Sequence, residues 1–368
     1  MSDILWFFGA GASKPFGIPT MQEMVTEFKD DLVKSEDKDR IGLFNDIWSF
    51  LAENLDHPID LEAVFTIVDS ITDWSSEKIG ISALYHATRC ANIEMKNEKQ
   101  KGTIRLIEPN SDEIGIARKL KIDFEEYIRR KCEDHPENNE KIKKIYGELF
   151  AIVGRRHGGV RNESGLFSGP WSIFTTNYDN IMEGYFLDIA KCPLITGFRY
   201  NGTTRMHTST PEVFRESTGP TKLFKLHGST SWYRHPDPDV GIVELELKPQ
   251  GNRTRDGREF GGQVMLYPIV EKELYHEPFI SMYHELVKTL KSTKYWLVIG
   301  YSFGDKIVRD IFINNSLKTT KMVLWHPHAK QIAVEKLKMF KGKIEPFEQR
   351  FGLDSHQQFC KQLDQFLE

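Results

Sequence analysis

The stretch Ile4-Leu-Trp-Phe-Phe8, followed directly by Gly9-Ala-Gly-Ala-Ser13, decides the fold class. Its five apolar residues are continuous rather than alternating, which is typical of a strand buried on both faces of a parallel α/β sheet. The glycines end this run abruptly, and Gly17-Ile-Pro19 follows. We therefore predict a central strand over residues 4–8 and a tight turn after it.

Strand and helix patterns alternate again in the C-terminal half of the chain. This alternation indicates an α/β fold with a Rossmann-like, doubly wound parallel sheet. Strands are predicted over 171–175, 223–227, 295–300, 322–325 and 344–347, and helices from near 179 and over 305–317, 329–340 and 354–367. Two further strands are predicted over 241–247 and 264–269.

Between these regions the apolar residues recur every three or four positions, which predicts helices. Two of the helices are expected at 112–132 and 139–153, and Asp60 is placed to cap a third that begins beside it. The polar stretch 94–111 is predicted to be a loop. We therefore expect a discontinuous Rossmann-like domain, residues 1–19 and 155–368, interrupted by an inserted all-helical domain, residues 20–154.

The charge balance and hydropathy of the 368 residues exclude several classes of protein. Lys and Arg number 49 against 53 Asp and Glu, a net charge of −4, so a nucleic-acid coat protein is excluded and nucleic acid would be contacted only indirectly. No segment approaches the roughly 20 apolar residues that span a bilayer, and the N-terminus lacks a cationic, signal-like start. We predict a cytoplasmic protein with no membrane contact.

The cysteines and histidines do not predict a metal site. Cys90, Cys132, Cys192 and Cys360 are widely spaced and form no C-x-x-C pair, so neither a disulfide framework nor a zinc ribbon follows. His86 with Cys90, and His326 with His328, have spacings that could ligate a metal. Helix packing explains the first pair better, and a turn explains the second.

The candidate binding residues follow the predicted strands, because open α/β sheets bind ligands at the carboxyl ends of their strands. Backbone N–H groups of a Gly-rich turn can hold a phosphate, although a simple tight turn is an equal alternative. This turn comprises Gly9, Ala10, Gly11, Ala12 and Ser13. The strands near 300 and 325 are followed by the further candidates Gly300, Ser302, Asp305 and His326.

The candidate catalytic residues are Asn177 and Asp179 after one strand and His227 after the next. An amide such as Asn177 can both donate to and accept from a ligand, whereas Asp179 could simply cap a helix. His227 lies beside Gly228 and is a candidate base, because histidine titrates near neutral pH. Thr176 stands between these residues as a further candidate for cofactor contact.

In this order the motifs resemble the sirtuin (silent-information-regulator-type) family, and most closely its bacterial sirtuin-like branch. The residues that carry the resemblance are Thr175–Asp179, Leu226–Ser229 and Ile299–Asp305, together with the Gly9–Ser13 turn and the short motif Asp60-Leu-Glu62. Two departures from the deacylating sirtuins stand out. Thr176 occupies the place of their usual Gln, and the two C-x-x-C pairs of their zinc module are missing.

The resemblance implies an NAD+ hydrolase of anti-phage defence, with NAD as substrate and no zinc. Asn177 would position the water and the ribose, His227 would accept a proton, and Asp179 would orient Asn177 or contact the nicotinamide side. The Gly9–Ser13 backbone would hold the pyrophosphate. Gly300 and Ser302 would contact phosphate or the adenosine ribose with Asp305 nearby, and His326 would contact the adenosine.

The resemblance also implies regulation, because an unregulated NAD hydrolase would kill its own cell. Homo-oligomerisation is expected, as is a separate partner such as a HerA-type ATPase or an Argonaute-like protein that senses nucleic acid. Two alternatives remain open at this point, an NAD-dependent protein deacylase and a non-catalytic sensor that binds NAD or ADP-ribose.

Overall fold

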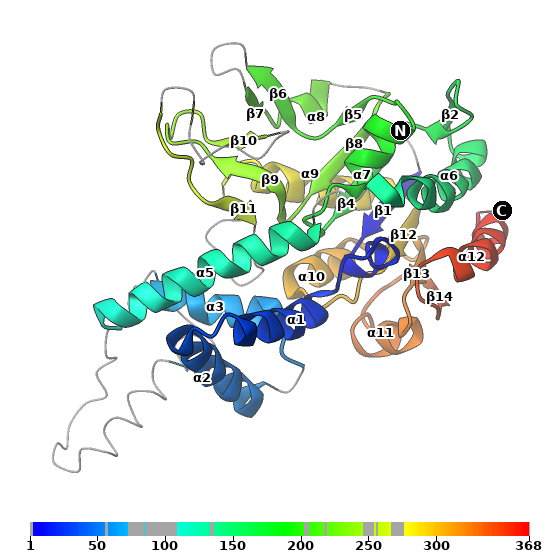
Figure 1. The fold of residues 1–368 in the computed structure, drawn as a ribbon. Coiled ribbons are helices and arrows are strands. Elements are labelled where there is room, and N and C mark those ends of the chain that lie inside the picture. The colour runs from blue at the N-terminus through cyan, green and yellow to red at the C-terminus, as the bar shows by residue number, and fades with distance from the viewer. Residues whose placement is uncertain are drawn as a thin grey trace. The chain divides into compact units, whose positions relative to one another are not determined.

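The computed structural model describes residues 3–55, 58–72, 85, 109–132, 136–201, 206–216, 219–245, 254, 257–265 and 276–367 (Figure 1). The chain divides into two compact units. The first unit comprises Met1–Ile18 with Lys131–Glu368, and the second comprises Pro19–Arg130. The first unit is therefore discontinuous in sequence, and the second is inserted into it.

A seven-stranded sheet forms the centre of the first unit, in the order β14-β13-β12-β1-β4-β8-β5. All its neighbouring strands run parallel, which confirms the predicted fold class. From β1 the chain continues to β4 and β8 on one side and later to β12, β13 and β14 on the other. The strands are β1 (Ile4–Phe8), β4 (Ser172–Thr175), β5 (Leu194–Ile195), β8 (Thr221–Lys225), β12 (Tyr295–Ile299), β13 (Lys321–Trp325) and β14 (Lys343–Phe347).

The register of this sheet brings four strand ends to one edge. Phe8 of β1 pairs with Ile299 of β12 on one side and with Thr175 of β4 on the other. Thr175 pairs in turn with Lys225 of β8. The strand order reverses between β1 and β12, so the loops after these four strands surround the switch point at which open α/β sheets bind ligands.

Helices cover both faces of the sheet. Alternate residues of β1 point to opposite sides, so each face carries apolar side chains that a helix can bury. Leu5 and Phe7 share a core with α9 (Phe279–Ser292) and α10 (Lys306–Asn315). Trp6 packs instead against Phe150 of α6 (Asn139–Arg156). The remaining helical elements of this unit are η2 (Lys14–Phe16), η3 (Pro136–Asn138), α7 (Ile181–Glu183), the π-helix η4 (Gly184–Ile189), α8 (Val213–Glu216), α11 (Ala329–Glu335) and α12 (Leu353–Phe366).

Helix α6 lies in a different unit from the one that periodicity predicts. The sequence places residues 131–154 in the helical insertion, whereas these residues group with the sheet. The reason is visible in the side chains of α6, since Tyr146 and Phe150 pack against Phe8 and Trp6 of β1. Helical periodicity reports that one face of a helix is buried but does not identify what buries it.

A smaller antiparallel sheet is formed by strands that lie before and after β8 in the sequence, in the order β11-β9-β10-β7-β6. In the described residues, β10 and β11 overlap the strands predicted over 241–247 and 264–269, and the other three were not predicted. These five strands are β6 (Phe198–Asn201), β7 (Met206–Ser209), β9 (Gly228–Arg234), β10 (Ile242–Glu244) and β11 (Gln263–Met265), and a separate hairpin pairs β2 (Val160–Arg161) with β3 (Phe167–Ser168).

The second unit is helical in its described residues. Its aromatic core includes Phe28, which stacks on Phe124 with ring centroids 3.8 Å apart. Asp60 Oδ1 accepts a hydrogen bond from the Ala63 N–H at 2.9 Å, which confirms the predicted cap. The helices are α1 (Met21–Lys34), α2 (Lys38–Asn54), α3 (Leu61–Thr72) and most of α5 (Ser111–Cys132).

Some predictions fall outside the described residues, namely the His86 and Cys90 pair and most of the 94–111 loop. Within the described ranges, every helix falls short of the length and apolar character that crossing a membrane requires.

Candidate functional site

The loops after β1 and β12 interlock through their backbones. Gly9 N donates to the Ile299 carbonyl, and Gly11 N donates to the Gly300 carbonyl, both at 2.9 Å. Gly300 has φ +68°, and a Cβ atom there would lie 2.2 Å from the Ala12 nitrogen. Glycine is therefore required where the two loops cross, because any side chain would meet backbone.

These contacts use N–H groups that were predicted to hold a phosphate. The loop folds into a short 3₁₀ helix, η1 (Ala10–Ala12). The N–H groups of Gly9, Gly11, Ala12 and Ser13 all donate to carbonyls of the protein. The tight-turn alternative thus describes this backbone well, and a bound phosphate would find fewer N–H donors here than the residue pattern indicates.

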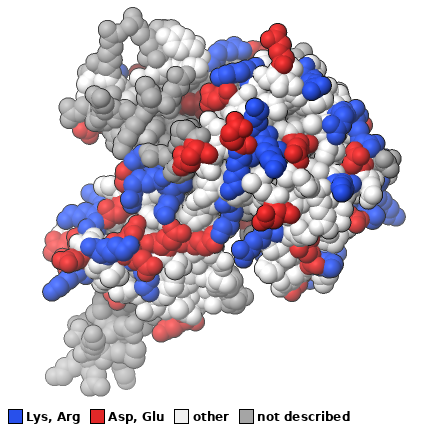
Figure 2. Space-filling view, turned by 45° about the vertical axis from the view of Figure 1, so that its right-hand side comes forward, with Lys and Arg blue, Asp and Glu red and all other residues white. Residues whose placement is uncertain are grey.

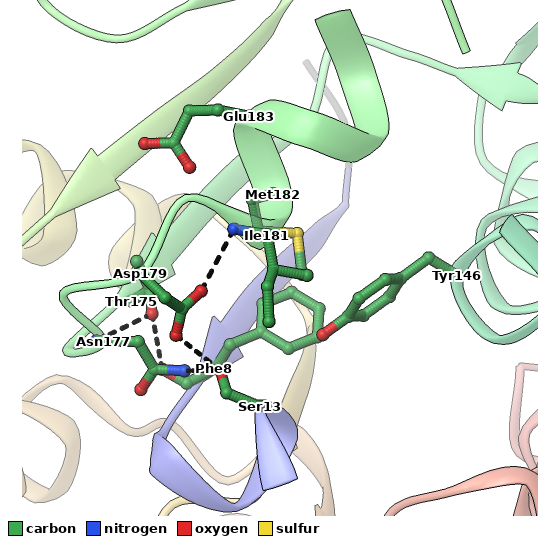
Figure 3. A pocket seen from close by; sticks show the side chains of 9 residues that line it. All are labelled: Phe8, Ser13, Tyr146, Thr175, Asn177, Asp179, Ile181, Met182 and Glu183. Carbon is green, nitrogen blue, oxygen red and sulfur yellow. Dashed lines mark hydrogen bonds between the residues drawn. The ribbon is translucent and has the colours of Figure 1, made fainter. Parts of the chain in front are cut away.

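Three predicted site residues form one hydrogen-bonded chain beside this turn (Figure 3). Asn177 Nδ2 donates to Ser13 Oγ at 2.8 Å, and Ser13 Oγ donates to Asp179 Oδ2 at 2.6 Å. Asn177 Nδ2 also donates to the Gly9 carbonyl at 3.0 Å. Because a carbonyl can only accept, the Gly9 contact fixes which end of the Asn177 amide is the nitrogen.

The other end of this amide is a buried acceptor, Asn177 Oδ1, which has no hydrogen-bond partner among the residues that the structure describes. In Figure 3 this oxygen points away from Ser13. An unpaired buried acceptor costs about 1–3 kcal/mol, so this position favours a ligand or water that donates a hydrogen bond. The amide was expected to donate as well as accept, but both of its N–H groups are already used.

The chain of hydrogen bonds lines a small pocket with a cavity volume of about 10 Å³. A cavity of about this size holds one water molecule, so this pocket fits a water rather than part of a dinucleotide. Its walls are formed by Phe8, Ser13, Tyr146, Thr175, Asn177, Asp179, Ile181, Met182 and Glu183. Asp179 also caps the turn of α7, because its Oδ1 accepts from the Ile181 N–H at 3.1 Å.

His227 is oriented by a buried carboxylate. Its Nε2 lies 3.1 Å from Asp305 Oδ2, and both side chains are buried. Asp305 Oδ1 accepts from the N–H groups of Ile307 and Val308 and so caps α10. In the neutral ring the proton on Nε2 faces Asp305, which leaves the Nδ1 lone pair to accept a proton.

The pairing with His227 differs from the contact expected for Asp305. The sequence suggested that Asp305 contacts the cofactor, whereas both of its carboxylate oxygens hold protein groups. The contact joins the loops after β8 and β12, which are separated by β1 and β4. Three strand spacings amount to about 14 Å, so the Asp305 loop crosses the carboxyl edge of the sheet to reach His227.

The remaining candidates lie apart from this hydrogen-bonded chain. Thr176 is buried, and its N–H donates to the Phe8 carbonyl. Ser302 is exposed, and its carbonyl accepts from Lys336 Nζ at 3.0 Å. Burial, with the nearby charges of His328 and Lys336, lowers the pKa of His326 to about 4.

His326 is consequently neutral at physiological pH. Its Nδ1 accepts from the His328 N–H at 3.0 Å, which places the ring proton on Nε2. In the described residues no three His, Cys, Asp or Glu side chains are grouped as a metal site would need. Cys132, Cys192 and Cys360 are buried free thiols, and Cys90 lies outside the described residues.

Sequence reasoning missed one residue of this region, Lys225 at the end of β8. Its ammonium is buried and donates to Glu183 Oε1 at 2.9 Å and to the Asp179 carbonyl at 2.6 Å. The available signal was a charged residue inside the apolar run Leu223-Phe-Lys-Leu226.

Residues 172–338 match the family model described as SIR2-like domain. This SIR2-like region begins at β4, and it contains Asn177, Asp179, His227 and Asp305, whereas Ser13 and the Gly9–Ser13 turn precede it. Among curated proteins, no sequence match was found.

Solved structures similar to the chain include a Sir2 homologue in complex with NAD, at 12% identity, TM-score 0.43 and coverage of 100% of this chain and 91% of that one. A variant Sir2 homologue in complex with ADP-ribose has 10% identity, TM-score 0.43 and coverage of 99% and 91%. The fold class itself rests on the observed strand order.

Proposed function

We propose that the protein is an NAD+ hydrolase that cleaves the nicotinamide–ribose bond to give nicotinamide and ADP-ribose. The observation that carries this proposal is the Asn177 amide, whose N–H groups are held by Ser13 and Gly9 while its buried Oδ1 has no partner in the described part of the chain. The match of the SIR2-like region to its family model supports a nucleotide substrate of this type.

Cleavage of this bond requires that the ribose and a water molecule are positioned, and it does not require a general acid. Nicotinamide is cationic in the substrate and leaves neutral, so its bond to C1′ breaks without prior protonation, unlike the usual glycosidic bond. The site must hold the ribose, stabilise an oxocarbenium-like transition state and place one water. Asn177 Oδ1 accepts a hydrogen bond from that water or from a ribose hydroxyl.

His227 acts as the base in this proposal. As the water oxygen bonds to C1′, one of its protons passes to Nδ1 of His227, while Asp305 holds the ring by Nε2 and stabilises the imidazolium. Asp179 does not touch the reacting atoms. It positions Asn177 through the Ser13 hydroxyl that lies between them.

The rest of the dinucleotide is proposed to lie along the interlocked loops after β1 and β12. The exposed Ser302 hydroxyl is available to phosphate or to the adenosine ribose. The neutral His326 offers an Nε2–H donor toward the adenosine. Gly9–Ser13 and Gly300 contribute mainly by keeping side chains out of this path.

In the cell, we propose, this activity depletes NAD as the effector of anti-phage defence, in the cytoplasm, under the control of homo-oligomerisation or of a partner such as a HerA-type ATPase or an Argonaute-like protein. Figure 2 shows Lys and Arg interspersed with Asp and Glu over the described residues of one face. That distribution, with the net charge of −4, supports contact with nucleic acid through a partner.

The test is nicotinamide release from NAD+ by the purified protein, alone and with the product of its genomic neighbour. We expect Asn177→Ala and His227→Ala each to lower turnover by about 100-fold or more. Asn315→Ala is a matched control, because the Asn315 amide donates to the Ile311 carbonyl of its own helix.

Three outcomes discriminate between the functions. Peptide-independent release that is lost in both variants establishes the hydrolase. Release only with an acetyl-lysine peptide indicates a deacylase, and NAD binding without release under any condition indicates a sensor. Wild-type turnover in Asn177→Ala contradicts the mechanism.

A further inference from the structure

Lys225, the last residue of β8, lies beside the site but has no role in the proposed mechanism. Its side chain is 1% exposed, although it carries a charge. The preceding residue, Phe224, belongs to the core shared with α9 and α10, and strand alternation directs Lys225 to the opposite face. A buried ammonium is costly unless it is paired and hydrogen-bonded, so its partners show what it stabilises.

Those partners lie in the segment directly after Asn177. Lys225 Nζ donates to the Asp179 carbonyl at 2.6 Å, to Asn180 Oδ1 at 2.9 Å and to Glu183 Oε1 at 2.9 Å. A fourth acceptor, Ser229 Oγ, lies at 2.8 Å on β9, and a fifth, the Tyr178 carbonyl, lies at 3.4 Å. An ammonium has three N–H groups, so these five acceptors saturate it.

The segment after Asn177 depends on such contacts, because its own helical structure is short. Helix α7 has three residues and continues as the π-helix η4. The Tyr178 carbonyl accepts from the Thr230 N–H at 3.1 Å and from Ser229 Oγ at 3.3 Å. The peptides that follow Asn177 are therefore held by the end of β8 and by the start of β9.

Asp179 connects this buried charge to the site. Its carbonyl accepts from Lys225, while its carboxylate accepts from the Ser13 hydroxyl that in turn accepts from Asn177. We propose that Lys225 is a positioning residue, whose ammonium, balanced by Glu183, holds the Asp179 peptide and through it the Asn177 amide. This inference rests on the proposed function, and it adds a residue that touches no substrate.

The experiment separates positioning from charge balance. Lys225→Met removes the ion-pair partner of the Glu183 carboxylate, whose side chain is only 13% exposed, so Tm falls for a purely structural reason. In Lys225→Met/Glu183→Gln both charges are gone, and we expect most of the lost Tm to return. The kcat for nicotinamide release should nevertheless stay about 10- to 100-fold below wild type, with little change in KM, because small displacements of catalytic groups reduce turnover strongly.

Lys222→Met is the matched control on the same strand, since Lys222 Nζ donates to the Phe214 carbonyl and, within the described ranges, forms no hydrogen bond to the 177–183 segment. It should keep wild-type kcat. Recovery of both Tm and kcat in the double variant would overturn the inference, because Lys225 would then serve only to neutralise Glu183.

A crystal structure of the double variant tests the inference even if the wild-type protein, with its partner, releases no nicotinamide and the proposed function fails. Displacement of the Asn177 amide and the Asp179 carboxylate from Ser13 supports the positioning role. An unchanged Ser13–Asn177–Asp179 chain contradicts it.

Discussion

At the scale of single residues, the site depends on the hydroxyl group of Ser13. It accepts from Asn177 and donates to Asp179, so one hydroxyl joins the two side chains. Ser13→Ala should leave the Asp179 Oδ2 atom buried without its donor, and we expect a loss of about 1–3 kcal/mol in the free energy of unfolding. Nicotinamide release should also fall, because the Asn177 amide would be held by Gly9 alone. Urea denaturation and steady-state kinetics measure the two effects.

Ser302→Ala provides the comparison for Ser13→Ala, since the Ser302 side chain is exposed. It should leave the free energy of unfolding within about 0.5 kcal/mol of wild type. Equal stability of Ser13→Ala and wild type would show that the Ser13 hydroxyl contributes nothing to the chain of hydrogen bonds.

The residue types of the site could be predicted, whereas their partners could not. Strand ends followed by Asn177 and His227 were identifiable because apolar runs stop there. The pairing of Ser13 with Asp179 joins residues 166 positions apart, and that of His227 with Asp305 joins residues 78 apart. Local patterns carry no information on such contacts, so Ser13 and Asp305 were both assigned to the cofactor.

Glu244 makes the protein's stability depend on pH. Burial raises the pKa of Glu244 to about 7, with a further contribution from Glu183, while Lys225 opposes the shift. Between pH 4.5 and 7 the unfolded chain loses this proton and the folded protein keeps it, so stability falls as pH rises through that window. The effect amounts to about 3 kcal/mol, by the free energy of one pKa unit.

Glu244→Gln mimics the protonated form and should remove this dependence. We expect the variant to gain stability relative to wild type between pH 5 and pH 8, measured by urea denaturation at both values. If the difference in the free energy of unfolding between the two proteins were constant across this pH range, Glu244 would not titrate there.

At the scale of elements, the crossing of the β1 and β12 loops leaves no space for a side chain at Gly300. Gly300→Ala places a methyl group 2.2 Å from the Ala12 nitrogen in a left-handed backbone conformation. We expect a loss of at least about 2 kcal/mol in the free energy of unfolding, and loss of nicotinamide release as the loops separate. Gly304→Ala is the control in the same loop, because its nearest neighbour would be the Ser302 hydroxyl at 3.5 Å. Equal stability of the two variants would contradict this account.

Helices and strands with a strong hydrophobic pattern in their own sequence could be predicted. Features that depend on contacts with distant segments of the chain could not. The central parallel strands β1 and β12 are apolar runs buried on both faces. Apart from the buried Phe198, the residues of β6 and β7 are instead exposed or half-buried, so these sequences carry little hydrophobic pattern. Helix α6 was recognised as a helix but was assigned to the insertion, because its contacts with β1 lie outside its own sequence.

At the scale of the whole molecule, the chain folds into two compact units. The side chains of the proposed site, Ser13, Asn177, Asp179, His227 and Asp305, all belong to the discontinuous unit of residues 1–18 and 131–368. A ligand of this site should therefore stabilise one unit and not the other. Calorimetry can detect this, because units that unfold independently give separate transitions.

We expect two thermal transitions, and ADP-ribose should raise the Tm of only one of them. At 100 times its Kd the ligand adds about 2.7 kcal/mol to the stability of the unit that binds it. For a unit of this size that corresponds to a rise of roughly 5–10 °C in Tm. Gly300→Ala should lower the same transition.

Phe124→Ala identifies the other transition. Phe124 is fully buried and stacks on Phe28 in the helical unit, so its removal should cost that unit about 3–5 kcal/mol. If ADP-ribose raised the transition lowered by Phe124→Ala, the helical insertion would have to contribute to the site. A single transition that responds to both variants and to the ligand would mean that the two cores unfold as one.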